Sequence, residues 1–353
     1  MKRSTADRNL RIYRRYAPLL FAAVVAVFAE GQNLAKRQAP TKSEQTPEAD
    51  QQDQNGNALR NALAEPSDDD SNQSFRVGGS VQVESDTMLR SAPYNAVILE
   101  TIRRMPTGGD YRASSESIDK LEAAIKQEGN RLAVDAAVAK PSFCSSATYL
   151  VFVSALEELN GRGKIQFEPG VAVKLLVSGQ HDGDGVWGRW NANGPGTARL
   201  FEELGLGENF ISIDQAQRGD FLKIFWNDQI GSKEFGHSVV YLGHGRDAAG
   251  VEVVKYWSSN KKGGYGEAAV PRSKIKRMLF SRLTHPERIN NIRELPPDEY
   301  LASMLRRGST PEEMYSKVGI PSSAIAAPIP APSIDGENKA NGADPKVGQK
   351  KEN

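Results

Sequence analysis

The chain of 353 residues contains one cysteine, Cys144, in a position where it could act as a nucleophile. Pro141-Ser142-Phe143 precedes it and the most apolar helical stretch of the chain follows it, so Cys144 should open a helix. Free N–H groups and the positive dipole end at a helix N-terminus stabilise a thiolate and can hold a developing oxyanion. The alternative is a small apolar core residue, since a lone cysteine forms no intramolecular disulfide.

His237 is the best candidate for the general base among the four histidines. It stands at the start of the apolar segment 237–242, which is typical of a strand. His181 and His244 lie in turns rich in Gly and Asp, and His285 follows the last expected strand, so we expect these three at the surface. The alternative for His237 is a structural histidine at the start of a strand.

A third residue should hold the imidazole ring in its working tautomer. Side chains alternate between the two faces of a strand, so Ser258 and Asn260 share one face at the end of segment 253–260. We expect Asn260 to orient His237 and take Ser258 as the second choice. The alternative for Asn260 is a turn-forming residue ahead of Lys261-Lys262-Gly263-Gly264.

The elements that must position these side chains follow from periodicity and turn residues. Helices are expected over 92–104, 117–127, 144–159 and 197–204. Strands are expected over 220–226, 237–242, 251–258 and 276–283. Helices first and antiparallel strands afterwards predict an α+β domain, with the apolar helix packed on the sheet.

The residues then resemble the NlpC-type and CHAP-type papain-like cysteine peptidases and amidases. Cys144-Ser145 resembles the nucleophile motif, Arg218-Gly219-Asp220 the strand before the base, and Gly236-His237 the base. Ser258-Ser259-Asn260 stands where the CHAP type has Glu-x-Asn, so Asn260 matches and Ser258 replaces the glutamate. Phe143 replaces the Asp or Gln that usually precedes the nucleophile, so no oxyanion-hole side chain is assigned from that position.

This resemblance, which covers roughly residues 142–260, implies a papain-like fold and amide hydrolysis through a thioester. In exported members the usual substrate is the peptide part of peptidoglycan, and neither a metal nor an organic cofactor is implied. Two other interpretations stay open: a non-catalytic cell-wall-binding module on the same scaffold, and an acyltransferase that uses the same dyad.

The insertion within the resemblance and one earlier loop could form walls of a substrate cleft. Segment 183–196 is rich in glycine and carries two tryptophans, and segment 105–111 contains a Gly-Gly turn. The residues that would line the cleft are Trp187, Trp190, Asn191, Gly109 and Tyr111. The alternative is a structural turn packed by its own tryptophans. His181, Asp182 and Asp184 match neither the zinc nor the calcium spacing.

Both ends of the chain have the composition of tails. Residues 1–29 have the basic, apolar and small-residue regions of a signal peptide, which predicts an exported, periplasmic or secreted protein, or a membrane anchor if the segment is not cleaved. Residues 30–75 read as a disordered linker and 322–353 as a disordered tail. The hydrolase domain is expected over 76–291, with a short helical extension over 292–321. A net charge of +1 gives no indication of a nucleic-acid partner.

Overall fold

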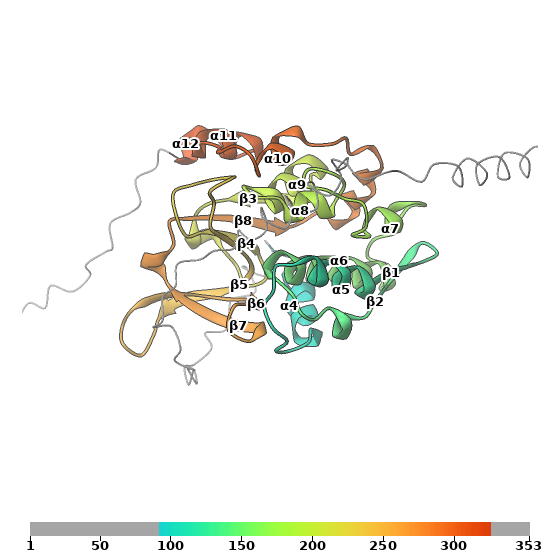
Figure 1. The fold of residues 1–353 in the computed structure, drawn as a ribbon, viewed down its shortest axis with the longest axis horizontal. Coiled ribbons are helices and arrows are strands. Elements are labelled where there is room, and N and C mark those ends of the chain that lie inside the picture. The colour runs from blue at the N-terminus through green and yellow to red at the C-terminus, as the bar shows by residue number, and fades with distance from the viewer. Residues whose placement is uncertain (1–91, 326–353) are drawn as a thin grey trace, which may run out of the picture. The chain divides into compact units, whose positions relative to one another are not determined.

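The computed structural model describes residues 92–325, and the expected signal segment, linker and most of the C-terminal tail lie outside them (Figure 1). Within 92–325, no helix combines the length and the apolar character needed to cross a bilayer. These residues form helices and antiparallel strands, so the predicted α+β class is confirmed.

A six-stranded sheet is the centre of the fold, and all its neighbouring strands are antiparallel. In spatial order its strands are β3 (Gly207–Phe210), β8 (Arg277–Leu283), β4 (Phe221–Phe225), β5 (Gly236–Arg246), β6 (Glu252–Asn260) and β7 (Gly264–Pro271). A separate hairpin pairs β1 (Ile125–Glu128) with β2 (Arg131–Val134).

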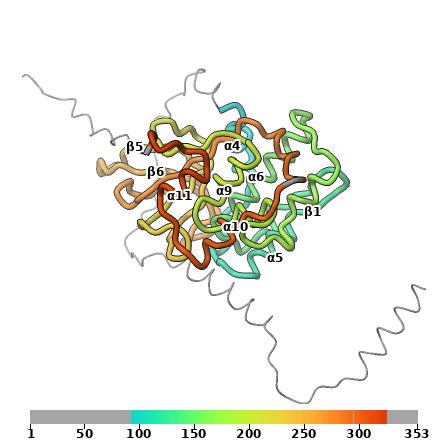
Figure 2. Tube along the Cα trace, turned by 90° about the horizontal axis from the view of Figure 1, so that it is seen from above, coloured from blue at the N-terminus to red at the C-terminus, as the bar shows by residue number. Residues whose placement is uncertain are grey.

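Helices cover one side of this sheet. In both Figure 1 and Figure 2, β5 and β6 lie on one side of the fold, and α5 and β1 lie on the other. The helices before the sheet are α4 (Asn95–Arg104), α5 (Ser115–Ala124) and α6 (Cys144–Gly161), with a 3-10 turn η1 (Ala136–Val138). The insertion between α6 and β3 contains α7 (Val171–Lys174), α8 (Trp187–Asn191) and α9 (Gly196–Leu204).

Helix α6 is the core helix, because nearly all of its side chains are buried. It packs on Val240 of β5 and Trp257 of β6 in the largest apolar cluster. Val239, Tyr241 and Tyr256 belong to a second cluster on the opposite face of the sheet. Alternate residues of β5 and β6 therefore face the helices and the second cluster, as strand geometry requires.

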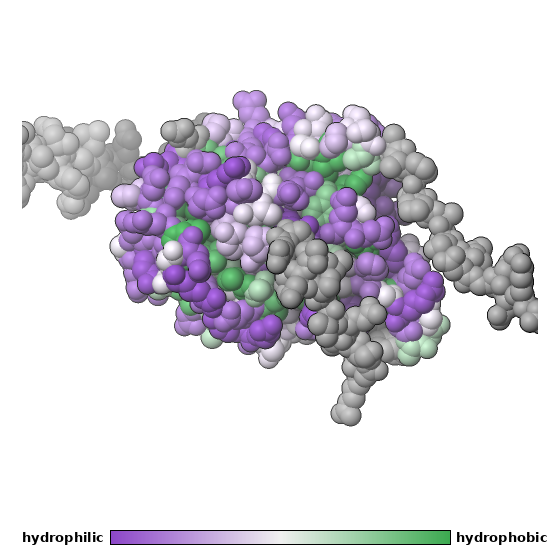
Figure 3. Space-filling view, turned by 180° about the vertical axis from the view of Figure 1, so that it is seen from behind, coloured by the Kyte–Doolittle hydropathy of each residue, from purple (hydrophilic) through white to green (hydrophobic). Residues whose placement is uncertain are grey.

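Little apolar surface is left outside these clusters. The face seen in Figure 3 is mainly hydrophilic, with smaller hydrophobic areas between the polar residues. Among the described residues, the large apolar side chains that are exposed are Val138, Val173 and Val251.

Several elements differ from the sequence prediction. The expected helix 117–127 runs from Ser115 to Ala124 and gives way to β1, because Gly129 and Asn130 close a two-residue hairpin between Glu128 and Arg131. Strands β2, β3 and β7 were not predicted. In β7, half-exposed and exposed residues replace the apolar run that marks a buried strand.

Residues 286–325 form a run of short helices that packs on the insertion. They are η4 (Pro286–Glu294), α10 (Glu299–Ser303), α11 (Pro311–Lys317) and α12 (Ser322–Ile325). Two further 3-10 turns, η2 (Ile213–Gln215) and η3 (Arg272–Lys274), lie before β4 and β8. Arg199 of α9 forms an ion pair with Asp298, and Leu301 and Met304 are fully buried. The segment that the sequence predicted as an extension thus shares a core with the sheet domain.

The inward-facing side chain of Arg189 holds the insertion together. This arginine is fully buried, and its guanidinium donates to the carbonyls of Gly183, Gly185 and Pro296 and pairs with Glu203. Burying a charge without partners costs free energy, and these hydrogen bonds and the ion pair offset that cost for Arg189. The loop that contains Gly183 and Gly185 is therefore fixed to both α9 and the C-terminal helices.

Candidate active site

Cys144 is the first residue of α6, and the segment before it is fixed to both the helix and the sheet. Phe143, the N-cap, donates its backbone N–H to Ser146 Oγ at 2.9 Å. Ser142 Oγ lies 2.8 Å from Ser259 Oγ on β6, and both serines are buried. The nucleophile candidate is thus held beside the end of β6, where Asn260 stands.

His237 lies near the start of β5, and its ring faces the same side of the sheet as the second apolar cluster. The register pairs Val240 with Trp257 and Tyr241 with Tyr256, and continued along both strands it brings Asn260 opposite His237. The imidazole is 4% exposed. Its ring centre lies 6.3 Å from that of Trp226 and 5.5 Å from that of Tyr256. Aromatic packing on two sides restricts the ring to one orientation.

Asn260 determines which ring nitrogen of His237 is available for proton transfer. Its Oδ1 lies 3.2 Å from His237 Nε2, and its Nδ2 donates to the carbonyls of Ser258 and Gly266. Because both amide hydrogens are used in this way, the amide oxygen faces the ring and accepts from Nε2–H. In the tautomer with the proton on Nε2, Nδ1 is unprotonated and can accept a proton from the thiol.

His237 lies close enough to the thiol of Cys144 to lower its pKa, and the environment of the thiol favours the thiolate. Burial raises the pKa of Cys144, but four effects lower it: the hydrogen bond to His237, the positive charge of that ring, the backbone N–H of Ser238, and the charge of Lys223. Together they bring the pKa down from 9.0 to about 7. A substantial fraction of the thiol is therefore ionised at neutral pH.

Ser258 has a different role from the one expected from strand alternation, which was to orient the His237 ring. Its hydroxyl is fully buried and donates to the backbone carbonyl of Ser238 at 2.7 Å. Its own carbonyl accepts from the Asn260 amide. Ser258 therefore ties β6 to β5 and orients Asn260, whereas Asn260 contacts the His237 ring.

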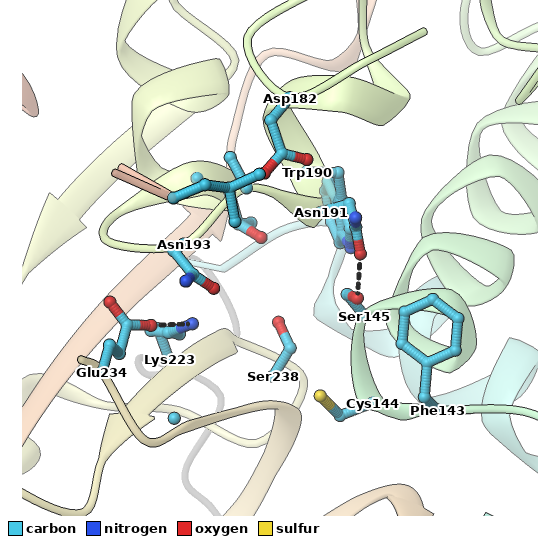
Figure 4. A pocket seen from close by; sticks show the side chains of 15 residues that line it. Phe143, Cys144, Ser145, Asp182, Trp190, Asn191, Asn193, Lys223, Glu234 and Ser238 are labelled. Carbon is cyan, nitrogen blue, oxygen red and sulfur yellow. Dashed lines mark hydrogen bonds and ion pairs between the residues drawn. The ribbon is translucent and has the colours of Figure 1, made fainter. Parts of the chain in front are cut away.

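A pocket opens beside the thiol. Its cavity volume is about 60 Å³, and Cys144 lies at its edge with 7% of its surface exposed. Figure 4 shows Asp182, Trp190 and Asn191 on the side of the pocket away from Cys144, and Lys223 with Glu234 on a third side. Other lining residues are Phe143, Ser145, Ala192, Asn193, Gly196, Thr197, Gly236, Ser238 and Leu305.

The structure places the two tryptophans in the core. Trp187 is 3% exposed, packs edge-on against Phe143 and Tyr149, and does not line the pocket. Trp190 is 2% exposed, stacks on Phe152 and reaches the pocket with one edge. Trp187 therefore forms no wall of this pocket, because α8 turns its indole inward onto α6.

The other three predicted cleft residues occupy different places. Asn191 lines the pocket, and its Oδ1 accepts a hydrogen bond from Ser145 Oγ at 2.7 Å. Tyr111 is held by a backbone bridge to Ser142, and its hydroxyl lies 3.9 Å from Cys144 Sγ. Gly109 is exposed and does not line the pocket, and its assignment as a binding residue stays a prediction. A Cβ on Gly264 would lie 1.8 Å from the Gly109 carbonyl, so this loop packs closely on the start of β7.

Sequence reasoning assigned no role to three charged residues of the pocket. Lys223 forms an ion pair with Glu234 at 2.6 Å, and Glu234 also accepts from the backbone N–H groups of Gly194 and Gly231. Asp182 is half-buried on the opposite side. The one usable signal was Lys223, a single charge within the apolar strand Phe221–Phe225.

Two further searches complete the description of the site. Among residues 92–325, no group of three or more His, Cys, Asp or Glu side chains could hold a metal ion. Comparisons of the chain with protein-family models, with curated proteins and with solved structures found no match.

Proposed function

We propose that this protein is a cysteine hydrolase that cleaves amide bonds, acts outside the cytoplasm on the peptide part of peptidoglycan, and has a papain-like fold. The observation that carries the proposal is the series Cys144, His237 and Asn260 beside a pocket, in which His237 lowers the pKa of the thiol and its ring is hydrogen-bonded to Asn260. The choice of peptidoglycan rests on the resemblance of residues 142–260 to the NlpC and CHAP types and on the expected signal segment.

In the acylation step, the Cys144 thiolate attacks the carbonyl carbon of the scissile amide. His237 Nδ1 takes the thiol proton, and the resulting imidazolium keeps its Nε2–H on Asn260 Oδ1. The proton then passes from Nδ1 to the leaving nitrogen as the C–N bond breaks. The products are a free amine and an acyl group bound to Cys144 as a thioester.

The negative charge that develops on the carbonyl oxygen has two candidate sources of stabilisation. The first N–H groups of α6 have no acceptor within the helix and point toward its N-terminus, where Cys144 stands. The Tyr111 hydroxyl, 3.9 Å from the sulfur, is the second donor within reach of an oxygen on the attacked carbon. Phe143 cannot act as a donor, because its side chain has no polar hydrogen.

In the deacylation step, a water molecule enters the pocket from which the amine has departed. His237 Nδ1 accepts a proton from this water as its oxygen attacks the thioester carbon. The C–S bond breaks, the acyl group leaves as a carboxylic acid, and the thiol regains its proton from the imidazolium. If an amine rather than water attacks, the same residues carry out acyl transfer.

The properties of the site favour chemistry over simple binding. A non-catalytic wall-binding module needs no lowered thiol pKa, whereas that of Cys144 falls to about 7. Such a module also uses exposed aromatic side chains to contact its ligand, but Trp187 and Trp190 are buried. These two findings make the binding module the weaker alternative.

Digestion of purified peptidoglycan by the full chain tests the proposal. Mass spectrometry of the released fragments should show new amino and carboxyl groups in equal amounts, and Cys144→Ser should release none. Repeating the digestion with a free amine in excess separates hydrolysis from acyl transfer, since only a transferase would attach most of the acyl groups to the amine. Unchanged peptidoglycan after prolonged incubation with the wild-type protein would contradict the proposal.

A further inference from the structure

Asp182 is a carboxylate in the pocket of Cys144 with no role in the dyad. It lies between α7 and α8 and lines the pocket on the side away from the sulfur (Figure 4). Asn191 accepts from Ser145 Oγ with its amide oxygen, and its amide also lowers the pKa of Asp182. This arrangement connects Asp182 to the residue next to the nucleophile.

The charges of the pocket leave Asp182 without a counterion. Lys223 is the one lysine that lines the pocket within the described residues, but it forms its ion pair with Glu234. Glu234 is nearly fully buried and accepts two backbone N–H groups with its other oxygen, so this pair is closed. No ion pair joins Asp182 to another residue within 92–325. Apart from the dyad, the pocket is lined by two carboxylates, Asp182 and Glu234, and one ammonium, Lys223, so it carries one excess negative charge.

The carboxylate of Asp182 is poorly stabilised in this position. Burial raises its pKa to about 6, and the Asn191 amide, His181 and the distant charge of Lys223 offset that effect only in part. The side chain is thus mostly ionised at neutral pH, but in surroundings that favour its neutral form. A cation entering the pocket would remove this penalty, because opposite charges attract most strongly where water is excluded.

We propose that the pocket takes a part of the substrate that carries a free amine, and that Asp182 binds this amine as an ammonium. The inference rests on the proposed function for the identity of the substrate. The cavity volume of about 60 Å³ has room for a small polar group such as an ammonium, and the rest of the residue that carries it would lie at the open mouth of the pocket. The amine could be the α-amine at a peptide N-terminus or the side-chain amine of a diamino acid, since both present the same ammonium group.

Binding measurements on a full-length Cys144→Ala variant test the inference without requiring turnover. The probes are one synthetic peptidoglycan stem peptide with both amines free, and the same peptide acetylated at its N-terminus only or at its side-chain amine only. Calorimetry should show that one of the two acetylations weakens binding roughly tenfold or more, because hydrogen bonds between charged groups are the strong ones. The acetylation that weakens binding identifies which amine enters the pocket.

Two further substitutions in the Cys144→Ala background assign the effect to Asp182. Asp182→Asn should remove the preference for the free amine while retaining a side chain that bonds to Asn191. Asp184→Asn is the matched control, because it makes the same chemical change two residues away and outside the pocket, and it should retain the preference. Equal binding of all three peptides, no binding of any, or a preference that survives Asp182→Asn would each overturn the inference.

The outcome is separable from that of the proposed function. If the wild-type protein digests peptidoglycan but no amine preference is found, the hydrolase proposal stands and the role of Asp182 fails. If the preference is found and depends on Asp182 but the wild-type protein digests nothing, the recognition site stands and the hydrolase proposal fails.

Discussion

Replacement of Asn260 by alanine removes the side-chain oxygen that accepts from His237 Nε2 and leaves Cys144 and His237 unchanged. The hydrogen bond it breaks is 3.2 Å long and contributes little while the ring is neutral. Once the ring is an imidazolium the same bond is charge-assisted, and such bonds contribute about 1.5–3 kcal/mol against about 0.5–1.5 kcal/mol for neutral ones. The transition state therefore loses roughly 1–1.5 kcal/mol more than the ground state.

That difference corresponds to about a tenfold fall in kcat, since 1.36 kcal/mol is a factor of ten in rate. Loss of the preferred tautomer adds to it, because an unrestrained imidazole also populates the form protonated at Nδ1, which cannot accept the thiol proton. We expect a total decrease of roughly tenfold to a hundredfold in kcat, with a small change in KM. Asn260→Asp should retain part of the activity, because it keeps an acceptor oxygen.

The assay is steady-state release of amide products by the variants, with thermal unfolding measured alongside. Ser258→Ala is the matched control on the same strand, because Ser258 donates to the Ser238 carbonyl and does not accept from the ring. It should lower the unfolding temperature and change kcat less than Asn260→Ala does. If Asn260→Ala is silent while Ser258→Ala is crippling, the assignment of the third residue is wrong.

Three other substitutions have defined outcomes. Tyr111→Phe should lower kcat about tenfold or more with an unchanged unfolding temperature, because it removes a donor near the oxyanion position; an unchanged kcat would exclude that role. Ser259→Ala leaves the buried Ser142 hydroxyl without this partner and should reduce the free energy of unfolding, measured in urea, by about 1–3 kcal/mol. Trp187→Ala should reduce it by about 3–5 kcal/mol, as expected for a core aromatic; a value near zero would show that the side chain is not packed.

Cys144 and His237 could be chosen from the sequence because each stands at the start of a helix or strand that its apolar residues predict. Cys144 precedes an apolar helix and His237 an apolar strand, and strand alternation places Asn260 on the ring's face of the sheet. The α+β class followed from the same periodicity. Register between β5 and β6, which brings Asn260 opposite His237, depends on pairing that one strand alone does not reveal.

The pocket was less predictable because it is built from the insertion and from long-range contacts. A glycine-rich loop with two tryptophans suggested exposed aromatics, but α8 folds both indoles onto α6. The charges of Asp182 and Glu234 become significant only once their neighbours in space are known. Strand β7 escaped prediction because its partly exposed residues lack a continuous apolar pattern.

The measurement that tests the central claim most directly is the pH titration of Cys144, followed by thiolate absorbance or by alkylation rate. The chain has one cysteine, so the signal has a single source. The wild-type midpoint should lie near 7, and in His237→Asn it should rise to 9.0 or above, because burial remains while the largest effect that lowers the pKa is removed. A wild-type midpoint at or above 9.0, or one that His237→Asn does not shift, would contradict activation of Cys144 by His237.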